Sequence, residues 1–338
     1  MQMELRSQAI EGELLAPDSG FAPARTRLEQ RWDPLTGHSS RLVQSPDELF
    51  PPNTYDLARL ADQTRTGCPF CPDLIETVTP KFAPSIWPKG RIRRGQALLF
   101  PNLRAYARHT SVAVYGADLH YLPLERLQER LIGDNLAAQV DFARAVLAAD
   151  PAAAWVSINA NHMLPSGSSL FHPHTQGAAH PQPSTMQALL AAQPRERFED
   201  YLASERRHGR RHLGSTGTVE WLASFAPLGP AELRAFLPGA ASPARLGGDR
   251  VAELAHGIAT ALGLYAELGF QSFNLALYGA PPGTPGYPLN LRMLARSNLD
   301  TPYRSDATFM ERLHWEAALD LTVTPEALAD RAADRFRR

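Results

Sequence analysis

The order of strand-like and helix-like segments constrains the fold most, because a similar order recurs along the chain. In the first half, short runs rich in β-branched or aromatic residues and bounded by turn formers predict strands. These runs cover residues 97–100, 111–116 and 155–161. Between the last two, residues 122–149 repeat apolar side chains at intervals of three and four, as in an amphipathic helix. We therefore expect one antiparallel sheet with a helix packed on it.

The second half carries a similar series of segments. A helical, arginine-rich stretch is followed by a strand-like run, a helix and two further strand-like runs, at residues 187–212, 218–229, 251–268, 270–279 and 287–296. Thr324 and Pro325 then occupy the N-cap and first position of a closing helix. The sequence predicts an α+β protein with antiparallel sheets, packed helices and two similar halves. We place these halves at residues 31–185 and 186–338, after an N-terminal extension of residues 1–30 that lacks clear periodicity.

Composition and charge favour a small-molecule substrate. Hydrophobic residues make up 44% of the 338 residues and charged residues 20%, which fits a globular protein of one or two domains. The formal net charge is -1 and the basic residues are scattered, so a long nucleic acid or an anionic membrane is not favoured as a partner. No apolar run approaches the ~20 residues that span a bilayer, and acidic residues interrupt the start of the chain. We expect a cytoplasmic protein.

The two cysteines of the chain, Cys68 and Cys71, form a CxxC pair. In a reducing compartment such a pair is more often a metal clip or a redox centre than a structural disulfide. The spacing is that of half a tetrahedral zinc site, which needs two further ligands from elsewhere. A long loop rich in proline and aspartate follows DPLTG (residues 33–37), and a bound metal would pin it. The alternative is two free thiols in a turn.

Residues 167–180, GSSLFHPHTQGAAH, carry the sharpest chemical signal. A strand over residues 171–179 would project His172, His174 and Gln176 from one face at intervals of roughly 6.5 Å. An imidazole is partly unprotonated at neutral pH and can attack phosphorus to form a labile N–P bond. Taken alone, the pattern is also compatible with an ordinary strand that carries incidental histidines.

The residues just before this strand are small. Gly167, Ser168 and Ser169 would let backbone N–H groups and hydroxyls approach a phosphate closely. Together with the histidines, they suit nucleotidyl transfer through a covalent intermediate.

Three motifs together carry a family resemblance. The pattern GxSxxHPHxQ, here residues 167–176, resembles the active-site motif of the galactose-1-phosphate uridylyltransferases, a family of the histidine-triad (HIT) superfamily. DPLTG and CPFC also occur in that family in the same order, and weaker similarity continues through residues 220–238 towards the end. The resemblance covers most of the chain from about Arg31, and it implies a HIT-like fold for each half.

The resemblance assigns roles to individual residues. His174 would be the nucleophile, and the Gln176 amide would hydrogen-bond a phosphoryl oxygen without activating water, so that transfer outruns hydrolysis. Ser169 and Asn161 would contact the phosphates, and Asn102 matches an asparagine of the family's nucleoside-contacting segment. For Asn161, the sequence alone is equally compatible with a turn residue at the end of a strand.

The resemblance also completes the metal site. It adds His120 and His172 to Cys68 and Cys71, which gives a Cys2His2 site for one structural zinc ion, with His109 as the competitor of His120. A closed four-ligand site leaves no open position for substrate, so zinc would pin the loop to the catalytic strand. Family members are typically dimers, and we therefore expect a homodimer.

The chain departs from the family where the nucleotide phosphates bind. Asp47 and Glu48 stand in place of cationic residues, so the donor would be held by other arginines. The candidates are Arg91, Arg93, Arg94 and Arg104. Leu103 replaces the acid that usually follows the matching asparagine, so the base need not be uridine.

Two family features are altered in the second half. The HxH of a second metal site, present in some members, reads NLRML at residues 290–294, and we predict that the second metal is absent. The family's hexose-contacting segment aligns only loosely with residues 309–322, where His314, Glu316 and Asp320 provide polar groups. We therefore do not expect galactose 1-phosphate as the acceptor. The alternative for these three residues is a helix with solvated charges.

The leading hypothesis is a ping-pong nucleotidyltransferase. His174 would take a nucleoside monophosphate from a nucleoside diphosphate donor, such as a nucleotide sugar, and pass it to a phosphorylated acceptor. The nearest alternative is a phosphorylase of a nucleotide sugar or a dinucleotide, in which inorganic phosphate is the acceptor. Gln176 disfavours a nucleotide hydrolase, and the intact HPHTQ sequence disfavours a non-catalytic nucleotide-binding or zinc-stabilised protein.

Overall fold

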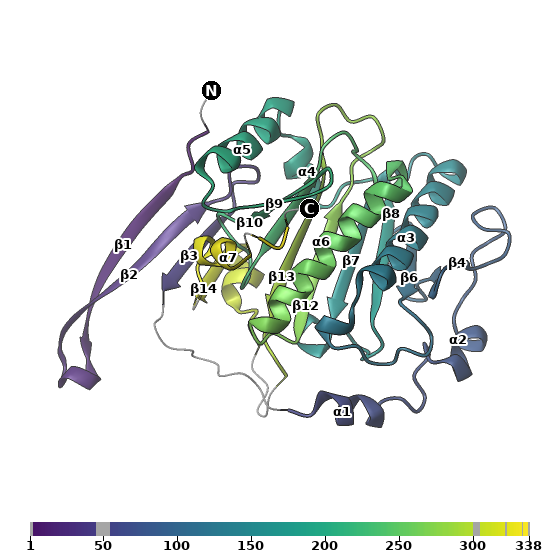
Figure 1. Cartoon of the computed structure of the whole chain (residues 1–338), viewed down its shortest axis with the longest axis horizontal. Helices are drawn as coiled ribbons and strands as arrows, with labels where there is room; N and C mark the ends of the chain where they lie inside the picture. Colours follow the sequence, from purple (N-terminus) through teal and green to yellow (C-terminus); the bar gives the residue numbers. More distant parts are fainter. Residues whose placement is uncertain (1–2, 45–54, 300–304, 322, 333, 337–338) are drawn as a thin grey trace.

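One long antiparallel sheet organises the protein, whose computed structural model describes residues 3–44, 55–299, 305–321, 323–332 and 334–336. Ten strands follow the spatial order β4-β5-β6-β8-β7-β12-β13-β11-β10-β9 (Figure 1). Their bounds are β4 (Ile92–Arg94), β5 (Ala97–Pro101), β6 (His109–Val114), β7 (Trp155–His162), β8 (His174–His180), β9 (His212–Thr216), β10 (Val219–Ala223), β11 (Leu233–Leu237), β12 (Ser272–Tyr278) and β13 (Leu289–Arg296).

The sheet uses one five-strand pattern twice. Outward from the middle, the first half runs β7-β8-β6-β5-β4 and the second runs β12-β13-β11-β10-β9. In each half a long helix follows the third strand along the chain: α3 (Glu129–Ala149) follows β6 and α6 (Gly248–Glu267) follows β11. The two patterns meet where β7 pairs antiparallel with β12. The predicted α+β fold with two similar halves is confirmed.

The two long helices cover one face of this sheet and lie against each other (Figure 1). Leu136 and Val140 of α3 share a core with Leu254 and Ile258 of α6 and with strands of both halves. These residues recur at intervals of four, so the periodicity that predicted each helix is the periodicity of its buried face.

Shorter helices cover the opposite face. In the second half, α4 (Thr185–Ala191) and α5 (Arg195–His208) contribute to a core that contains Tyr201 of α5 and Phe236 of β11. In the first half, α1 (Leu57–Gln63) and α2 (Pro72–Val78) flank the CPFC loop, and Ile75 of α2 shares a core with β5 and β6.

Two helices differ from their predicted extent. Helix α3 begins at Glu129 rather than near residue 122, because η2 (Leu124–Arg126) is a separate 3-10 turn and Gln128 is extended. The predicted helix over residues 187–212 is divided into α4 and α5 at Pro194, which is extended and lacks the N–H that a continuous helix needs.

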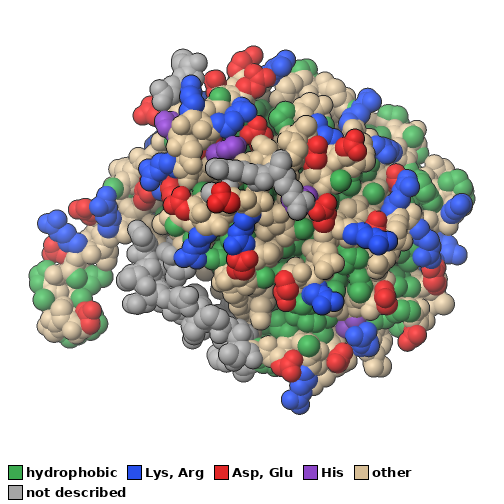
Figure 2. Space-filling view, in the orientation of Figure 1, with side chains coloured by type: hydrophobic (Ala, Val, Ile, Leu, Met, Phe, Trp, Pro, Cys, Tyr) green, Lys and Arg blue, Asp and Glu red, His purple; other side chains and the backbone are tan. Residues whose placement is uncertain are grey.

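A second sheet combines strands from both ends of the chain. Its order is β1-β2-β3-β14, with bounds β1 (Ser7–Ala16), β2 (Ala22–Trp32), β3 (Ser39–Gln44) and β14 (Ala317–Leu321), and η1 (Pro17–Ser19) connects β1 to β2. The β1–β2 hairpin projects from the body as an arm (Figure 1), and hydrophobic side chains gather near its free end (Figure 2). Nine of the ten β1 residues are exposed. No periodicity in the sequence predicted this arm.

The closing helix is α7 (Pro325–Ala332), and its predicted N-cap is confirmed. The Thr324 hydroxyl accepts a hydrogen bond from the N–H of Ala327 at 3.2 Å. The remaining short helical turns are η3 (Leu164–Ser166), η4 (Pro243–Arg245) and the π-helical η5 (Met310–His314). Within the described residues, no helix combines the length and apolarity needed to cross a membrane.

The DPLTG turn is held by a buried ion-pair network. One carboxylate oxygen of Asp33, Oδ2, lies 2.8 Å from Nη1 of Arg234 and 2.7 Å from Nη2 of Arg292, while Glu232 binds Arg292 at 2.8 Å. Burial alone would raise the pKa of Asp33, but the two arginines outweigh it and hold the pKa well below its usual range. This network fastens the small sheet to the second half of the large one.

We expect Asp33→Asn to lower the free energy of unfolding by about 3–5 kcal/mol at pH 7, because it leaves Arg234 buried without a counter-charge. The pKa of Asp33 is depressed in the folded state, so its contribution is complete above about pH 4 and is lost as the pH falls further. The difference in unfolding free energy between wild type and Asp33→Asn, measured with urea, should therefore stay constant from pH 7 to about pH 5 and decrease near pH 3. The exposed Asp18→Asn is the control, and an equal effect of both substitutions would contradict the network.

Candidate functional site

Four buried side chains converge between the CPFC loop and the start of β8. One ligand atom from each of Cys68, Cys71, His120 and His172 lies within 4.8 Å of the other three. The Cys71 sulfur is 3.3 Å from Nδ1 of His120 and 3.8 Å from Nδ1 of His172, and the Cys68 sulfur is 3.7 Å from the latter atom. A tetrahedral metal ion with bonds of about 2.0–2.3 Å separates its ligand atoms by roughly 3.3–3.8 Å, so the cluster can hold such an ion.

The outer ring nitrogens support this assignment. Nε2 of His172 lies 2.9 Å from the carbonyl of Gly116, and Nε2 of His120 lies 3.0 Å from the carbonyl of Ala61. A carbonyl only accepts, so each Nε2 carries the hydrogen and each Nδ1 turns its lone pair towards the sulfurs. Burial raises the pKa of Cys71 to about 11, with Cys68 adding to the shift, and burial lowers the pKa of His172 to about 4. A divalent cation here would favour the thiolate over the thiol.

His109 does not join this cluster. It begins β6, and its Nε2 lies 2.8 Å from a carboxylate oxygen of Asp150. Of the two histidines considered from the sequence, the structure brings only His120 to the cysteines.

Strand β8 begins at His174, so the predicted start at residue 171 is wrong. His172 lies in the segment before the strand, where its ring is fully buried and turned towards the cysteines. His174 and Gln176 are partly exposed and share the sheet face opposite α3, because side chains alternate along a strand. Thr175 and Gly177 face α3 instead, and Gly177 leaves room for Gln139, because a Cβ would lie 2.4 Å from the Gln139 amide oxygen.

The ring of His174 is held in one tautomer. Its Nδ1 lies 2.8 Å from the backbone carbonyl of His172, which only accepts, so Nδ1 carries the hydrogen and Nε2 keeps its lone pair. Phe70 of the CPFC loop contacts the ring edge to face, with centroids 5.3 Å apart. Burial lowers the pKa of His174, although the bond to the carbonyl opposes the shift. His174 is therefore a neutral imidazole with a free nitrogen at pH 7.

The loop before β8 has an unusual backbone. Met163 has φ 70° and ψ 161°, a region used almost only by glycine, and Gly167 has φ 95°. The N–H groups of Ser166 and Ser168 both donate to the Met163 carbonyl, at 3.2 and 3.4 Å. Gly167 and Ser169 are exposed, whereas Ser168 is buried and its hydroxyl donates to the Leu170 carbonyl at 2.7 Å. The loop therefore offers Gly167 and Ser169 to a ligand more readily than Ser168.

Asn161 lies beside His174 in the sheet. The β7–β8 register pairs Asn159 with Gln176 and Ala160 with Thr175, so the next step places Asn161 opposite His174. Asn161 is exposed, and by alternation it shares the face of His174 and Gln176.

The segment between β5 and β6 reaches the same face through a residue that sequence reasoning missed. Tyr106 is half-exposed, and its hydroxyl lies close to the side chain of Asn159. The predicted nucleoside contact, Asn102, accepts a hydrogen bond from the backbone of Arg104 at 3.0 Å and so shapes the turn. The position of Tyr106 depends on the folding of the whole segment, and no motif signals it.

No protein-family model matches the chain. An uncharacterised protein of Archaeoglobus fulgidus is 28% identical over 324 residues, which cover 94% of each protein. An ADP-glucose phosphorylase from Arabidopsis thaliana, solved with ADP-glucose, superposes with a TM-score of 0.66 at 15% identity over 91% of this chain and 99% of that one.

Two further solved structures share this architecture. A GalT-like protein from Arabidopsis thaliana has a TM-score of 0.64 at 16% identity, and it covers 91% of this chain and 99% of its own. A uridylyltransferase has a TM-score of 0.59 at 19% identity, with 91% and 98% coverage. The chain has the uridylyltransferase fold. The resemblance predicted from the three motifs is thus confirmed at the level of the fold.

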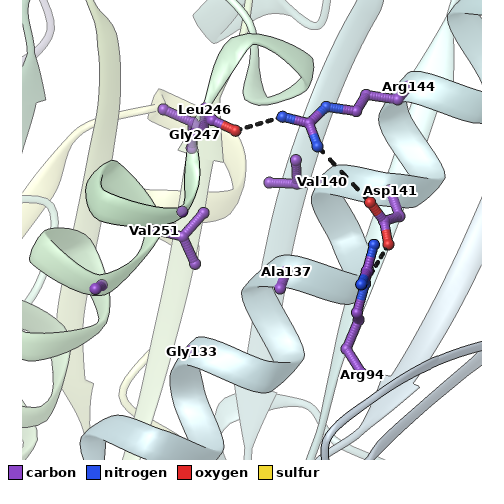
Figure 3. Close-up of a pocket in the computed structure, with 11 residues that line it drawn as sticks. Arg94, Gly133, Ala137, Val140, Asp141, Arg144, Leu246, Gly247 and Val251 are labelled. Atoms are coloured by element: carbon purple, nitrogen blue, oxygen red, sulfur yellow. Dashed lines mark hydrogen bonds and ion pairs between the residues drawn. The ribbon is translucent and has the colours of Figure 1, made fainter.

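Three of the four arginines considered as alternative binders of the donor phosphates are paired with carboxylates. Arg91 and Arg93 both bind Glu76. Arg94 binds Asp141 in a cavity of about 380 Å³ between α3 and α6, on the face opposite His174 (Figure 3). Arg104 is exposed and forms no ion pair with another described residue. Asp47 and Glu48 lie outside the described residues.

The second half places its altered motifs in structural roles. Arg292, within NLRML, belongs to the buried network with Asp33. His314 and Glu316 lie next to the small sheet, where Glu316 binds Arg41 at 2.9 Å, and Asp320 is part of β14. The structure does not bring these three polar residues onto the strand face that carries His174.

Proposed function

We propose that this protein is a nucleotidyltransferase that transfers a nucleoside monophosphate from a nucleoside diphosphate donor, such as a nucleotide sugar, to a phosphorylated acceptor. The observation that carries the proposal is the fixed tautomer of His174: Nδ1 is occupied by the His172 carbonyl at 2.8 Å, so Nε2 keeps its lone pair on a partly exposed residue. Asn161 and Gln176 lie beside it on that face. The uridylyltransferase fold adds the architectural context.

The chemistry proceeds in two balanced steps. Nε2 of His174 bonds to the α-phosphorus while the bond from that phosphorus to the leaving phosphate oxygen breaks, and that oxygen keeps the electron pair. The ring gains positive charge, which strengthens the hydrogen bond from Nδ1 to the His172 carbonyl. An oxygen of the acceptor phosphate then bonds to phosphorus, the N–P bond breaks and its electron pair returns to Nε2. Asn161, Ser169 and Gln176 would bind the phosphoryl oxygens.

The second candidate is a phosphorylase, which uses the same residues with inorganic phosphate as acceptor. The structural likeness to an ADP-glucose phosphorylase supports this second candidate. Release of a nucleoside diphosphate when labelled phosphate is the sole acceptor would identify a phosphorylase. Steady release of a nucleoside monophosphate without any acceptor would identify a hydrolase, which the amide of Gln176 disfavours.

We propose that the two predicted halves have different roles. Residues 31–185 carry the metal site and the nucleophile, while residues 186–338 support them, after the extension of residues 1–30. We also place the protein in the cytoplasm, because its two buried cysteines are free thiols beside two histidines rather than a disulfide.

We further propose zinc as the resident metal. Two thiolates and two imidazoles form a donor set typical of structural zinc, and a closed site of this kind stabilises the fold instead of taking part in the reaction. It would tie the CPFC loop to the segment that leads into β8.

Purified protein should contain one zinc ion per chain. Cys68→Ala should lose this ion and unfold at lower urea concentration, because the free energy of metal binding is part of the free energy of folding. Elemental analysis and urea unfolding measure the two effects, and metal-stripped wild type is the matched comparison. A Cys68→Ala protein that lost zinc but kept full stability would refute the structural role.

His174→Gly removes the group that forms the phosphorus bond and leaves the metal ligands in place. We expect it to keep its metal and to form no nucleotidyl adduct in intact-mass spectra after incubation with ADP-glucose or UDP-glucose, with partial recovery of turnover on addition of imidazole. His172→Asn should instead lose metal and stability. His180→Gly, which removes an exposed histidine from the same strand, is the matched control. An adduct that persisted in His174→Gly and vanished in His172→Asn would reverse the two roles.

We propose a homodimer, and the arm supports this proposal. Ile10 lies opposite Leu28 and Leu14 opposite Ala24 in the β1–β2 ladder, so one face of the arm is apolar, and an isolated two-stranded ribbon is only marginally stable in water. A second copy would cover that face.

Sedimentation equilibrium should give a dimer at micromolar concentration. Leu14→Glu should shift it to monomer, because it buries a charge in the covered face, while Glu13→Gln on the other face should not. A monomeric wild-type protein would contradict the proposal.

A further inference from the structure

Side chains from both halves of the sheet form one hydrogen-bonded row beside the nucleophile. In the β7–β12 register Asn274 lies opposite Asn161, which is itself next to His174. Nδ2 of Asn274 donates to Oδ1 of Asn161 at 2.6 Å, and Oδ1 of Asn274 accepts from Nη1 of Arg296 at 2.5 Å. The hydrogen-bonded row thus runs from β7 through β12 to β13, and its β7 end lies beside β8.

The chemistry of Arg296 fixes the orientation of both amides. A guanidinium has only donors, so the side of Asn274 that faces it must be the carbonyl oxygen. The amide nitrogen of Asn274 then faces Asn161, and Asn161 must present its own carbonyl oxygen in return. The Nδ2 group of Asn161 is left pointing away from Asn274 as a donor on the exposed face of the sheet.

Two further contacts hold the row in place. Arg296 pairs with Asp306, whose Oδ2 lies 2.7 Å from Nε of Arg296 and 2.8 Å from the N–H of Ser297. Nδ2 of Asn274 also donates to the carbonyl of Ser166 at 3.0 Å, within the loop that leads from Met163 to Ser169. Asn274 therefore contacts both elements that flank the proposed phosphate position, although it belongs to the other half of the protein.

We propose that Asn274 is a positioning residue that keeps Asn161 turned as a hydrogen-bond donor towards a phosphoryl oxygen, with Arg296 setting the direction of the row. This inference rests on the proposed function, in which Asn161 contacts the transferred phosphoryl group. If Asn161 turned over, its carbonyl oxygen would face an anionic oxygen and the attraction would become repulsion. The second half of the sheet thus supplies the orientation of a residue in the first.

The test is Asn274→Asp, which keeps the shape of the side chain and its bond from Arg296 but removes both donors. Asn161 would then turn its nitrogen to the new carboxylate and its oxygen to the substrate. We expect adduct formation on His174 from ADP-glucose or UDP-glucose to slow on the order of 100-fold, as when one transition-state donor is lost, with a smaller change in KM. Thermal unfolding monitors whether the variant stays folded.

A double-mutant cycle separates this role from a structural one. If Asn274 acts through Asn161, then adding Asn274→Asp to the Asn161→Ala variant should slow adduct formation by no more than about twofold. The side chain that Asn274 orients is already absent from that variant. An effect of equal size in both backgrounds would show that Asn274 acts by another route and would overturn the inference, as would a wild-type rate in Asn274→Asp.

The outcome also distinguishes this inference from the proposed function. If wild type forms no adduct with either donor, the proposed function fails, and the same cycle is then measured by calorimetric binding of AMP and UMP. If the two substitutions have non-additive effects on nucleotide affinity, Asn274 orients Asn161 at an anion-binding site even though no group is transferred. Additive losses in binding, or no binding of either nucleotide by wild type, would overturn the inference.

Discussion

The antiparallel pairing of β7 with β12 is the constraint on which the rest of the structure depends. It joins two five-strand patterns into one sheet, so that α3 and α6 share a single core instead of burying two separate ones. It also fixes which side chains of the second half stand beside His174, because a shift by one residue would turn each of them to the other face. The neighbourhood of His174 is therefore set by long-range strand pairing as much as by its own motif.

The two halves share a topology and use the corresponding face differently. In the first half, β8 carries His174 and Gln176 on a face that remains partly exposed. In the second half, the equivalent strand β13 carries Arg292, which is buried with Asp33 and Glu232. A carboxylate from the DPLTG turn occupies this second face, and α4 and α5 lie over the neighbouring strands. One copy of the pattern has an accessible strand face, and the other is filled by ion pairs.

The sequence predicts features that depend on local pattern and misses those that depend on register. The spacing of apolar residues predicts α3 and α6, and the histidine that the resemblance selects, His120, lies beside the two cysteines in the structure. The fold confirms the predicted likeness, while the roles of the individual site residues stay predictions. The sequence could not show that Asp33 would bind Arg234 and Arg292, which lie 201 and 259 residues away along the chain. The contact between Asn161 and Asn274 is equally non-local, since it follows only from the order of strands in the sheet.

The backbone of Met163 has a consequence for how the loop before β8 can vary. A non-glycine residue in this region costs on the order of 1–3 kcal/mol, which the surroundings must offset. The Met163 side chain is 2% exposed and shares a core with Leu57 and Ala61 of α1 and with Phe171. Glycine would relieve the backbone but leave a cavity under α1, whereas a β-branched residue would aggravate the strain. The backbone strain and the buried contact with α1 together favour a flexible, unbranched side chain of similar volume at this position.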